Sequence, residues 1–222
     1  MLTACWSVKG GSGTTVVAAT LTLGLLGVGR HVVAADFAGD LPTALGIAEP
    51  SGPGLLDWLG AGPNVPDDAL GRLAHLHENG LTIIARGDRP EPESTVAPDA
   101  DTGRRLADAL RAVRNGHPVV ADCGRLETSA MRSFVAAADR SFLVLRPCYL
   151  ALRRAVQAPR PTAVVLITEP DRSLSSGDIE DVLGVPVATE IAWNPAVARA
   201  VDSGLLGARL PRHLTRAMRS VA

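Results

Sequence analysis

A glycine-rich segment near the amino terminus constrains the fold of this chain more than any other feature. Three glycines lie between a lysine and two threonines, in the order Lys9-Gly10-Gly11-Ser12-Gly13-Thr14-Thr15. A strand-like apolar run at residues 2–8 precedes the segment, and a run suited to a helix follows at residues 15–27. A strand that turns through glycines into a helix brings successive backbone N–H groups and the positive end of the helix dipole together. The segment therefore predicts an anion site. A tight turn that merely needs glycine is the competing interpretation.

Short apolar runs alternate with helical stretches along the whole chain, which is the pattern of a parallel sheet covered on both faces. We expect seven strands, at residues 2–8, 31–35, 81–85, 118–121, 141–145, 162–167 and 185–189. We expect helices at residues 15–27, 41–45, 54–59, 67–77, 102–114, 131–138, 150–157, 176–183, 195–203 and 211–221, and a proline-rich loop at 86–101. The sequence thus predicts an α/β fold with a doubly wound, mostly parallel sheet. Its 222 residues suit one domain spanning residues 1–222.

Composition and charge narrow the class of protein. The formal net charge is −1, which gives no support to nucleic-acid binding. The cysteines Cys5, Cys123 and Cys148 have no paired spacing and are expected to be buried thiols in a reducing compartment. No signal-peptide pattern is present, and the apolar run at residues 21–28 is too short to span a membrane. We therefore expect a cytoplasmic protein.

Lys9 is notable because one lysine occurs among the 22 lysine and arginine residues. In a chain that uses arginine almost everywhere else, a lysine inside a glycine loop is better explained by chemistry than by chance. The two side chains are not interchangeable at a phosphate. We therefore interpret Lys9 as a phosphate-binding residue.

The order K-G-G-x-G-x-T resembles the deviant Walker A motif of the ParA/MinD family of P-loop nucleotide switches. The resemblance implies a homodimer around ATP or ADP and Mg²⁺, in which Lys9 reaches the partner's phosphates as a catalytic residue and Thr15 binds the metal. The implied cofactor-binding residues are Lys9, Gly10, Gly11, Ser12, Gly13, Thr14, Thr15, Val16 and Trp193. One position departs from the family pattern, because Thr14 stands where the family has a second lysine. A hydroxyl cannot neutralise phosphate oxygens as a charge does, so we expect weak or absent ATP hydrolysis.

The second predicted strand resembles the start of the family's switch segment. The family usually carries two aspartates separated by one residue there, and this chain reads Asp36-Phe37-Ala38-Gly39-Asp40. Ala38 therefore replaces the second acid of the pattern. We take Asp36 and Asp40 as candidate catalytic residues. For Asp40, capping of the helix at residues 41–45 is an equal alternative.

The fourth predicted strand resembles a Walker B strand, with the sequence Val119-Val120-Ala121-Asp122-Cys123-Gly124. Ligands of open α/β sheets bind at the carboxyl ends of the strands, so Asp122 is expected to face the glycine loop and to bind Mg²⁺ with Thr15. A helix-capping aspartate is the alternative. The family's adenine-binding asparagine is missing from residues 168–172. Trp193 either stacks on a base or covers the core.

The carboxyl-terminal region carries a local excess of arginines, namely Arg199, Arg209, Arg212, Arg216 and Arg219. A solvated helix face explains them, although contact with DNA, an acidic partner or anionic lipid is the alternative. The apolar residues Leu210, Leu214, Met218 and Val221 have the spacing of a core-facing helix. We therefore expect no membrane-binding helix at this position.

Two functions fit these observations, and a third fold is less favoured. The first function is a ParA/MinD-like switch that positions cellular cargo such as a division site, a chromosome, or a pilus or secretion apparatus. The second is a catalytically inactive dimeric scaffold of the TadZ/CpaE type, favoured by Thr14 and Ala38. A nicotinamide-dinucleotide fold is the third possibility, but Val16 stands where that motif needs its last glycine.

Overall fold

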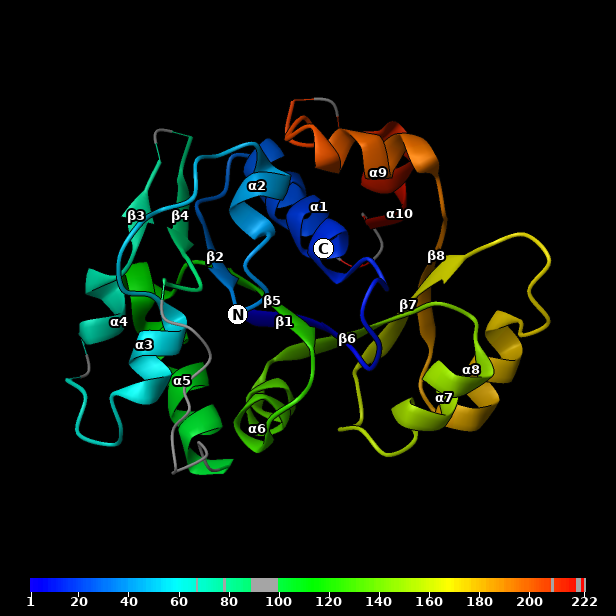
Figure 1. The fold of residues 1–222 in the computed structure, drawn as a ribbon, viewed down its shortest axis with the longest axis horizontal. Coiled ribbons are helices and arrows are strands. Elements are labelled where there is room, and N and C mark those ends of the chain that lie inside the picture. Colours follow the sequence, from blue (N-terminus) through cyan, green and yellow to red (C-terminus); the bar gives the residue numbers. More distant parts are fainter. Residues whose placement is uncertain (67, 78, 89–99, 209, 219–220, 222) are drawn as a thin grey trace.

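The computed structural model describes residues 1–66, 68–77, 79–88, 100–208, 210–218 and 221. Its centre is one sheet of eight strands in the order β3-β4-β2-β5-β1-β6-β7-β8 (Figure 1). The strands are β1 (Leu2–Ser7), β2 (Val32–Asp36), β3 (His75–Leu76), β4 (Leu81–Ile84), β5 (Val119–Arg125), β6 (Arg140–Leu145), β7 (Ala163–Thr168) and β8 (Val187–Ala192). β3 pairs antiparallel with β4, and the other described strand pairs are parallel. The predicted α/β fold with a mostly parallel sheet is confirmed.

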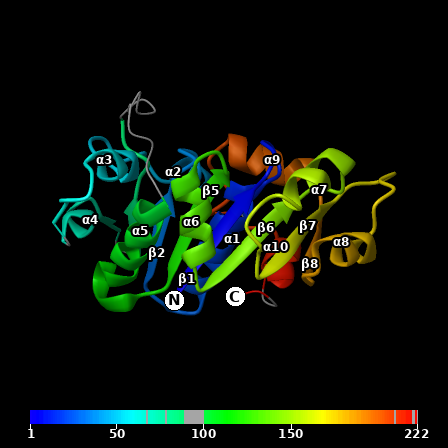
Figure 2. The same ribbon diagram turned by 90° about the horizontal axis from the view of Figure 1, so that it is seen from below.

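Helices cover both faces of the sheet. They are α1 (Thr14–Gly27), α2 (Leu41–Leu45), α3 (Leu55–Gly60), α4 (Ala69–Arg72), α5 (Ala100–Ala112), α6 (Ser129–Ala137), α7 (Tyr149–Ala155), α8 (Ser176–Leu183), α9 (Pro195–Asp202) and α10 (Arg212–Met218), with a 3-10 turn at Val113–Gly116. α1, α2, α9 and α10 pack on one face, and α3 to α8 pack on the other (Figures 1 and 2). No described helix is long and apolar enough to cross a membrane.

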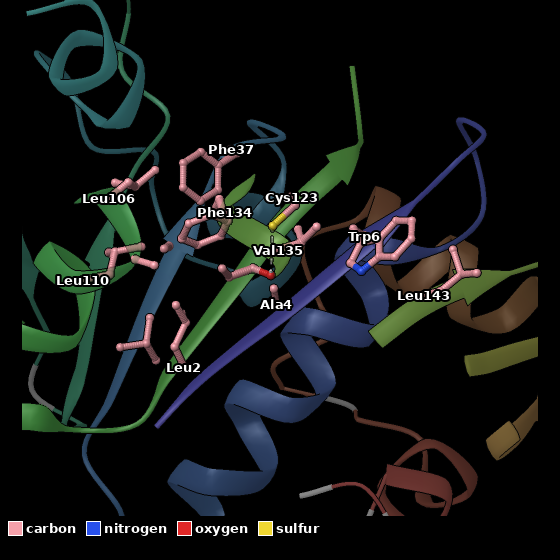
Figure 3. Packing of buried hydrophobic residues seen from close by; sticks show 14 of the residues in the cluster. Leu2, Ala4, Trp6, Phe37, Leu106, Leu110, Cys123, Phe134, Val135 and Leu143 are labelled. Atoms are coloured by element: carbon pink, nitrogen blue, oxygen red, sulfur yellow. Dashed lines mark hydrogen bonds between the residues drawn. The ribbon is translucent and has the colours of Figure 1, made fainter. Parts of the chain in front are cut away.

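The central strand β1 is buried on both sides and fixes the position of the glycine loop that follows it. Leu2, Ala4 and Trp6 point into the core beneath α5 and α6 (Figure 3), whereas Cys5 faces the core beneath α1. The indole Nε1 of Trp6 donates a hydrogen bond of 2.8 Å to Ser141 Oγ. β1 lies between β5 and β6, where the strand order reverses, and such a switch point is where open α/β sheets bind ligands.

The structure corrects two details of the sequence-based prediction. The sheet has eight strands rather than seven, because His75 and Leu76 form an edge strand within the segment predicted as a helix at residues 67–77. The helix there is limited to Ala69–Arg72, since the backbone beyond it pairs with β4 and His77 N donates to Leu81 O. Of the predicted loop at 86–101, residues 89–99 lie outside the described residues. Ala100 already begins α5.

The cysteines and the carboxyl-terminal helix agree largely with expectation. Cys5 and Cys123 are buried free thiols, while Cys148 is partly exposed and so departs from the prediction. Leu214, Met218 and Val221 are buried against α1, as a core-facing helix requires. Arg209 and Arg219 lie outside the described residues, so the predicted arginine face is described in part.

Gly103 in α5 provides a test of how closely α5 and α6 pack. A Cβ at this position would lie 2.1 Å from the Ala130 carbonyl oxygen and 2.7 Å from the Phe134 backbone nitrogen. We expect Gly103→Ala to lower the free energy of unfolding by about 1–3 kcal/mol through overpacking, although alanine favours helices. Urea denaturation measures the change.

Gly24 in α1 is the matched control, because a Cβ there would meet nothing within 4 Å. Gly24→Ala is expected to leave stability unchanged or to raise it by up to about 1 kcal/mol. If Gly103→Ala and Gly24→Ala change the free energy of unfolding by the same amount, the described close packing of α5 against α6 is contradicted.

Candidate functional site

The glycine loop joins β1 to α1 in the conformation that the sequence predicts. Gly11 and Gly13 have φ values of 73° and 93°, in the left-handed region that favours glycine. The Lys9 carbonyl oxygen accepts hydrogen bonds from Ser12 Oγ at 2.7 Å and Ser7 Oγ at 3.0 Å. These bonds close the loop on itself, so its shape is set before any ligand is present.

The backbone N–H groups of the loop are available to an anion. Within the described part of the chain, no N–H of residues 10–16 donates a hydrogen bond, and the first internal donor of the turn is Val17 N to Gly13 O. The first turn of α1 holds no acidic residue. Unpaired amides and the positive end of a helix dipole therefore converge here without a competing carboxylate, as phosphate binding requires.

Asp122 lies in the buried part of β5, beside the loop, as predicted. Its side chain is fully buried, Oδ1 accepts from Gly124 N at 3.1 Å, and the Thr15 side chain lies close to the carboxylate. Oδ2 is buried without a partner among the described residues. Burial raises the pKa of Asp122 to about 6, and the Thr15 side chain opposes that rise. The capping alternative for Asp122 finds no support in these partners.

Thr15 and Asp122 fit a magnesium ion. Mg²⁺ takes oxygen ligands and usually keeps several waters, so one or two protein oxygens suffice beside the phosphates of a nucleotide. The Oδ2 atom of Asp122 is buried and accepts no hydrogen bond from the described residues. A cation could coordinate this oxygen, or a water bound to the cation could donate a hydrogen bond to it. No group of three or more His, Cys, Asp or Glu side chains forms a metal cluster in the described ranges, and this donor set does not need one.

Asp36 organises the segment after β2. Its Oδ1 accepts from Ala38 N at 3.0 Å and Gly39 N at 2.9 Å, and its Oδ2 accepts from Leu41 N at 3.1 Å. Asp36 lies in register with Asp122 on the neighbouring strand. Burial, followed by the charge of Asp122, raises the pKa of Asp36 to about 7. Three backbone donors thus engage its carboxylate, which shapes the turn rather than leaving a free base.

Asp40 stands at the N-cap position of α2, but its side chain makes no capping hydrogen bond. The capping alternative for Asp40 is therefore wrong, because Asp36 accepts from the first amide of α2 instead. Asp40 is exposed, and its charge contributes to the raised pKa of Asp122. Its carboxylate therefore acts on the same site as the loop. Ala38 contributes no carboxylate there.

A cavity of about 280 Å³ adjoins the loop on the side of β7 and β8. Gly13, Ile167, Ile191 and Val197 contribute to its mostly apolar lining, and Trp193 lies at its edge with 46% of its surface exposed. Trp193 N donates to Thr168 O at 2.7 Å, which ties the segment after β8 to the end of β7. Trp193 therefore lies beside a cavity next to the glycine loop.

Arg146 and Glu169 also belong to this region, and sequence analysis missed both. Arg146 follows β6 and lines the cavity, and its Nη2 forms an ion pair of 3.0 Å with Glu169 Oε1. The hydrogen bond from Arg172 is the main cause that lowers the pKa of Glu169. The charge of the exposed Lys9 makes a smaller contribution in the same direction. The place of Arg146 directly after a predicted strand is the signal that could have identified it.

The raised pKa of Asp36 predicts a pH dependence of stability. The folded state holds the Asp36 proton more tightly than the unfolded chain, whose aspartate pKa is about 3.9. Asp36 therefore makes its whole contribution to the free energy of unfolding below about pH 3.9. The contribution is lost as pH rises through about 7. We expect Asp36→Asn to reduce the fall in unfolding free energy between about pH 4 and about pH 8, without abolishing it, since Asp122 titrates similarly.

Urea denaturation across this pH range measures the slope. The exposed carboxylate of Asp68, paired with Arg72, provides the control, and Asp68→Asn should leave the slope unchanged. Equal slopes in the wild type and Asp36→Asn would contradict the assignment of this pKa.

No protein-family model and no curated protein matches this sequence. Solved structures do match its fold. A ParA family ATPase from Chlorobium tepidum aligns with a TM-score of 0.71 at 21% identity, over 99% of this chain and 98% of that chain. MinD from Pyrococcus horikoshii with Mg-ADP aligns with a TM-score of 0.75 at 17% identity, over 99% and 93%. An ATP complex of a McdA variant from Cyanothece aligns with a TM-score of 0.70 at 17% identity, over 99% and 95%. The chain therefore has the α/β fold of the ParA and MinD ATPases.

Proposed function

We propose that this protein is a ParA/MinD-like nucleotide switch that binds ATP or ADP with Mg²⁺, forms a homodimer and positions a cellular cargo. One observation carries the proposal. Thr15 lies against Asp122 beneath a loop of unpaired amides, while Asp122 Oδ2 has no described partner. A structural turn has no need for a buried, half-satisfied carboxylate, whereas a metal–phosphate site does.

The roles of the residues follow from their places. The amides of residues 10–16 would bind the phosphates, and Thr15 and Asp122 would hold Mg²⁺ directly or through water. The metal, when bound, neutralises phosphate charge. The apolar cavity beside Trp193 would offer space for the base, and the aromatic ring would cover it.

Lys9 supports the dimer part of the proposal. Its side chain is exposed, and after the backbone hydrogen bonds of Ala151 and Leu150 its positive charge also lowers the pKa of Cys148, just before α7. The next two residues, Tyr149 and Leu150, are large and apolar, with exposures of 71% and 55%. A cationic side chain beside exposed apolar residues suits a second copy that meets this face across bound phosphates.

Hydrolysis is expected to be weak or absent. Thr14 is 6% exposed and carries no charge, Ala38 has no carboxylate, and Asp36 is committed to three backbone amides. Asp40 is the acid left to orient an attacking water. These same features favour the second candidate, a catalytically inactive dimeric scaffold of the TadZ/CpaE type for pilus or septum localisation.

The cargo is proposed by analogy alone. The similar Pyrococcus horikoshii protein is described as a septum site-determining protein, and a similar Borrelia burgdorferi protein as a putative plasmid partition protein. The candidate cargoes of this chain are therefore a division site, a chromosome, or a pilus or secretion apparatus.

ATP-dependent dimerisation tests the proposed switch. We expect ATP and Mg²⁺ to convert the protein to a dimer in light-scattering measurements, and we expect Lys9→Ala to remain monomeric because it removes the charge between the two copies. Arg104→Ala, which removes an exposed arginine paired with Asp101 on α5, should dimerise like the wild type. A wild-type protein whose mass ignores ATP would count decisively against the switch.

Restoring the missing lysine tests the explanation for weak turnover. Thr14→Lys is expected to raise ATP affinity by about tenfold or more, because a charge-assisted hydrogen bond contributes about 1.5–3 kcal/mol. Calorimetric titration measures the affinity, with Thr14→Ala as the uncharged control. Unchanged affinity in Thr14→Lys would show that this position is not the defect.

A further inference from the structure

Arg146 lies close to the glycine loop in the fold. It follows β6, the strand next to β1, at the same carboxyl edge of the sheet as the glycine loop. Arg146 lines one cavity together with Gly11, Ser12 and Gly13. Arg146 and the glycine loop therefore border the same space.

The guanidinium of Arg146 is only partly satisfied by the described residues. Its Nη2 pairs with Glu169 Oε1 at 3.0 Å, and 34% of its side chain is exposed. Its Nε is buried and meets no acceptor among the described residues. A buried donor without an acceptor carries a free-energy penalty, so Arg146 would gain from an additional anionic oxygen.

Glu169 can release Arg146 without becoming an isolated charge. Its other carboxylate oxygen, Oε2, accepts from Arg172 Nε at 2.7 Å and also from Arg172 Nη2. The charges of Arg146, Arg172 and Lys9 all lower the pKa of Glu169, after the Arg172 hydrogen bond. Two arginines thus pair with one carboxylate, and the charge of Lys9 acts on it as well, so the excess positive charge favours a polyanion.

This surplus of positive charge lies beside a glycine loop that has Thr14 where the related motif carries its second lysine. Thr14 is buried in the first turn of α1, and it cannot neutralise the phosphate oxygens that the loop amides would bind. An arginine can do so, because its planar fork of donors matches phosphate geometry.

We propose that Arg146 supplies the positive charge that Thr14 cannot, within the same chain, by exchanging its ion pair with Glu169 for a phosphate oxygen of the bound nucleotide. The proposal rests on the proposed nucleotide site and adds to it a phosphate-binding residue from outside the glycine loop. Glu169 then serves as a positioning residue that holds Arg146 in place before the nucleotide binds.

Calorimetric titration with ADP and with adenosine tests the proposal, because adenosine shares the base and ribose but lacks phosphates. Arg146→Gln is expected to weaken ADP binding by about tenfold or more and to leave adenosine binding unchanged. Arg146→Lys, which keeps the charge but loses the planar fork of donors, should bind ADP with an affinity between those of Arg146→Gln and the wild type. Arg104→Gln, a surface arginine paired with Asp101, should match the wild type for both ligands.

A double variant makes the test specific to the missing loop charge. If Arg146 substitutes for a lysine at position 14, Thr14→Lys introduced into Arg146→Gln should restore ADP affinity to at least the wild-type level. Thermal unfolding of each variant reports whether the chain still folds, and Arg146→Lys keeps the test informative if Arg146→Gln does not.

Three results would overturn the proposal. Equal loss of ADP and adenosine binding in Arg146→Gln would assign the arginine to the base, and unchanged ADP binding would remove it from the site. Either outcome leaves the proposed nucleotide function standing. A wild-type protein that binds no ADP would remove the nucleotide site itself and this proposal with it.

Discussion

The buried carboxylate of Asp122 is the constraint on which the rest of the site depends. It lies in register with Cys5 of the central strand and with Asp36 of the next strand, so the sheet fixes its position. Removing a carboxylate from water is costly unless it is paired, and one of its oxygens has no described partner. Thr15, at the start of α1, lies against it and thereby ties the helix that carries the anion-binding amides to β5.

Most of the fold could be predicted because its strands are short apolar runs and its loop is punctuated by glycine. β1, α1 and the carboxyl ends of β2 and β5 follow from local pattern and from the geometry of parallel sheets. β3 could not be predicted, since His75 and Leu76 are an edge pair stabilised by hydrogen bonds to β4 rather than by their own apolar character. The site was predictable where residues lie in the loop or directly after strands.

The parts of the site that sequence reasoning missed depend on side-chain geometry. Nothing in the order of residues 36–40 says that Asp36, rather than Asp40, accepts from the first amide of α2. The pairing of Arg146 with Glu169 joins segments that follow β6 and β7, and only the adjacency of these two strands brings them together. The departures from the family motif at Thr14 and Ala38 can be read from the sequence. The residues that lie near Thr14 in space could be identified only from the three-dimensional structure.

Amide hydrogen exchange with and without Mg²⁺ and ADP tests the central claim most directly, because the claim concerns specific backbone N–H groups. The amides of residues 10–16 have no described acceptor, so they should exchange rapidly in the free protein. The account predicts that Mg²⁺ and ADP together slow exchange at these amides, while amides of the distant α5 stay unchanged. Exchange at residues 10–16 that is unaffected by saturating Mg²⁺ and ADP would contradict it.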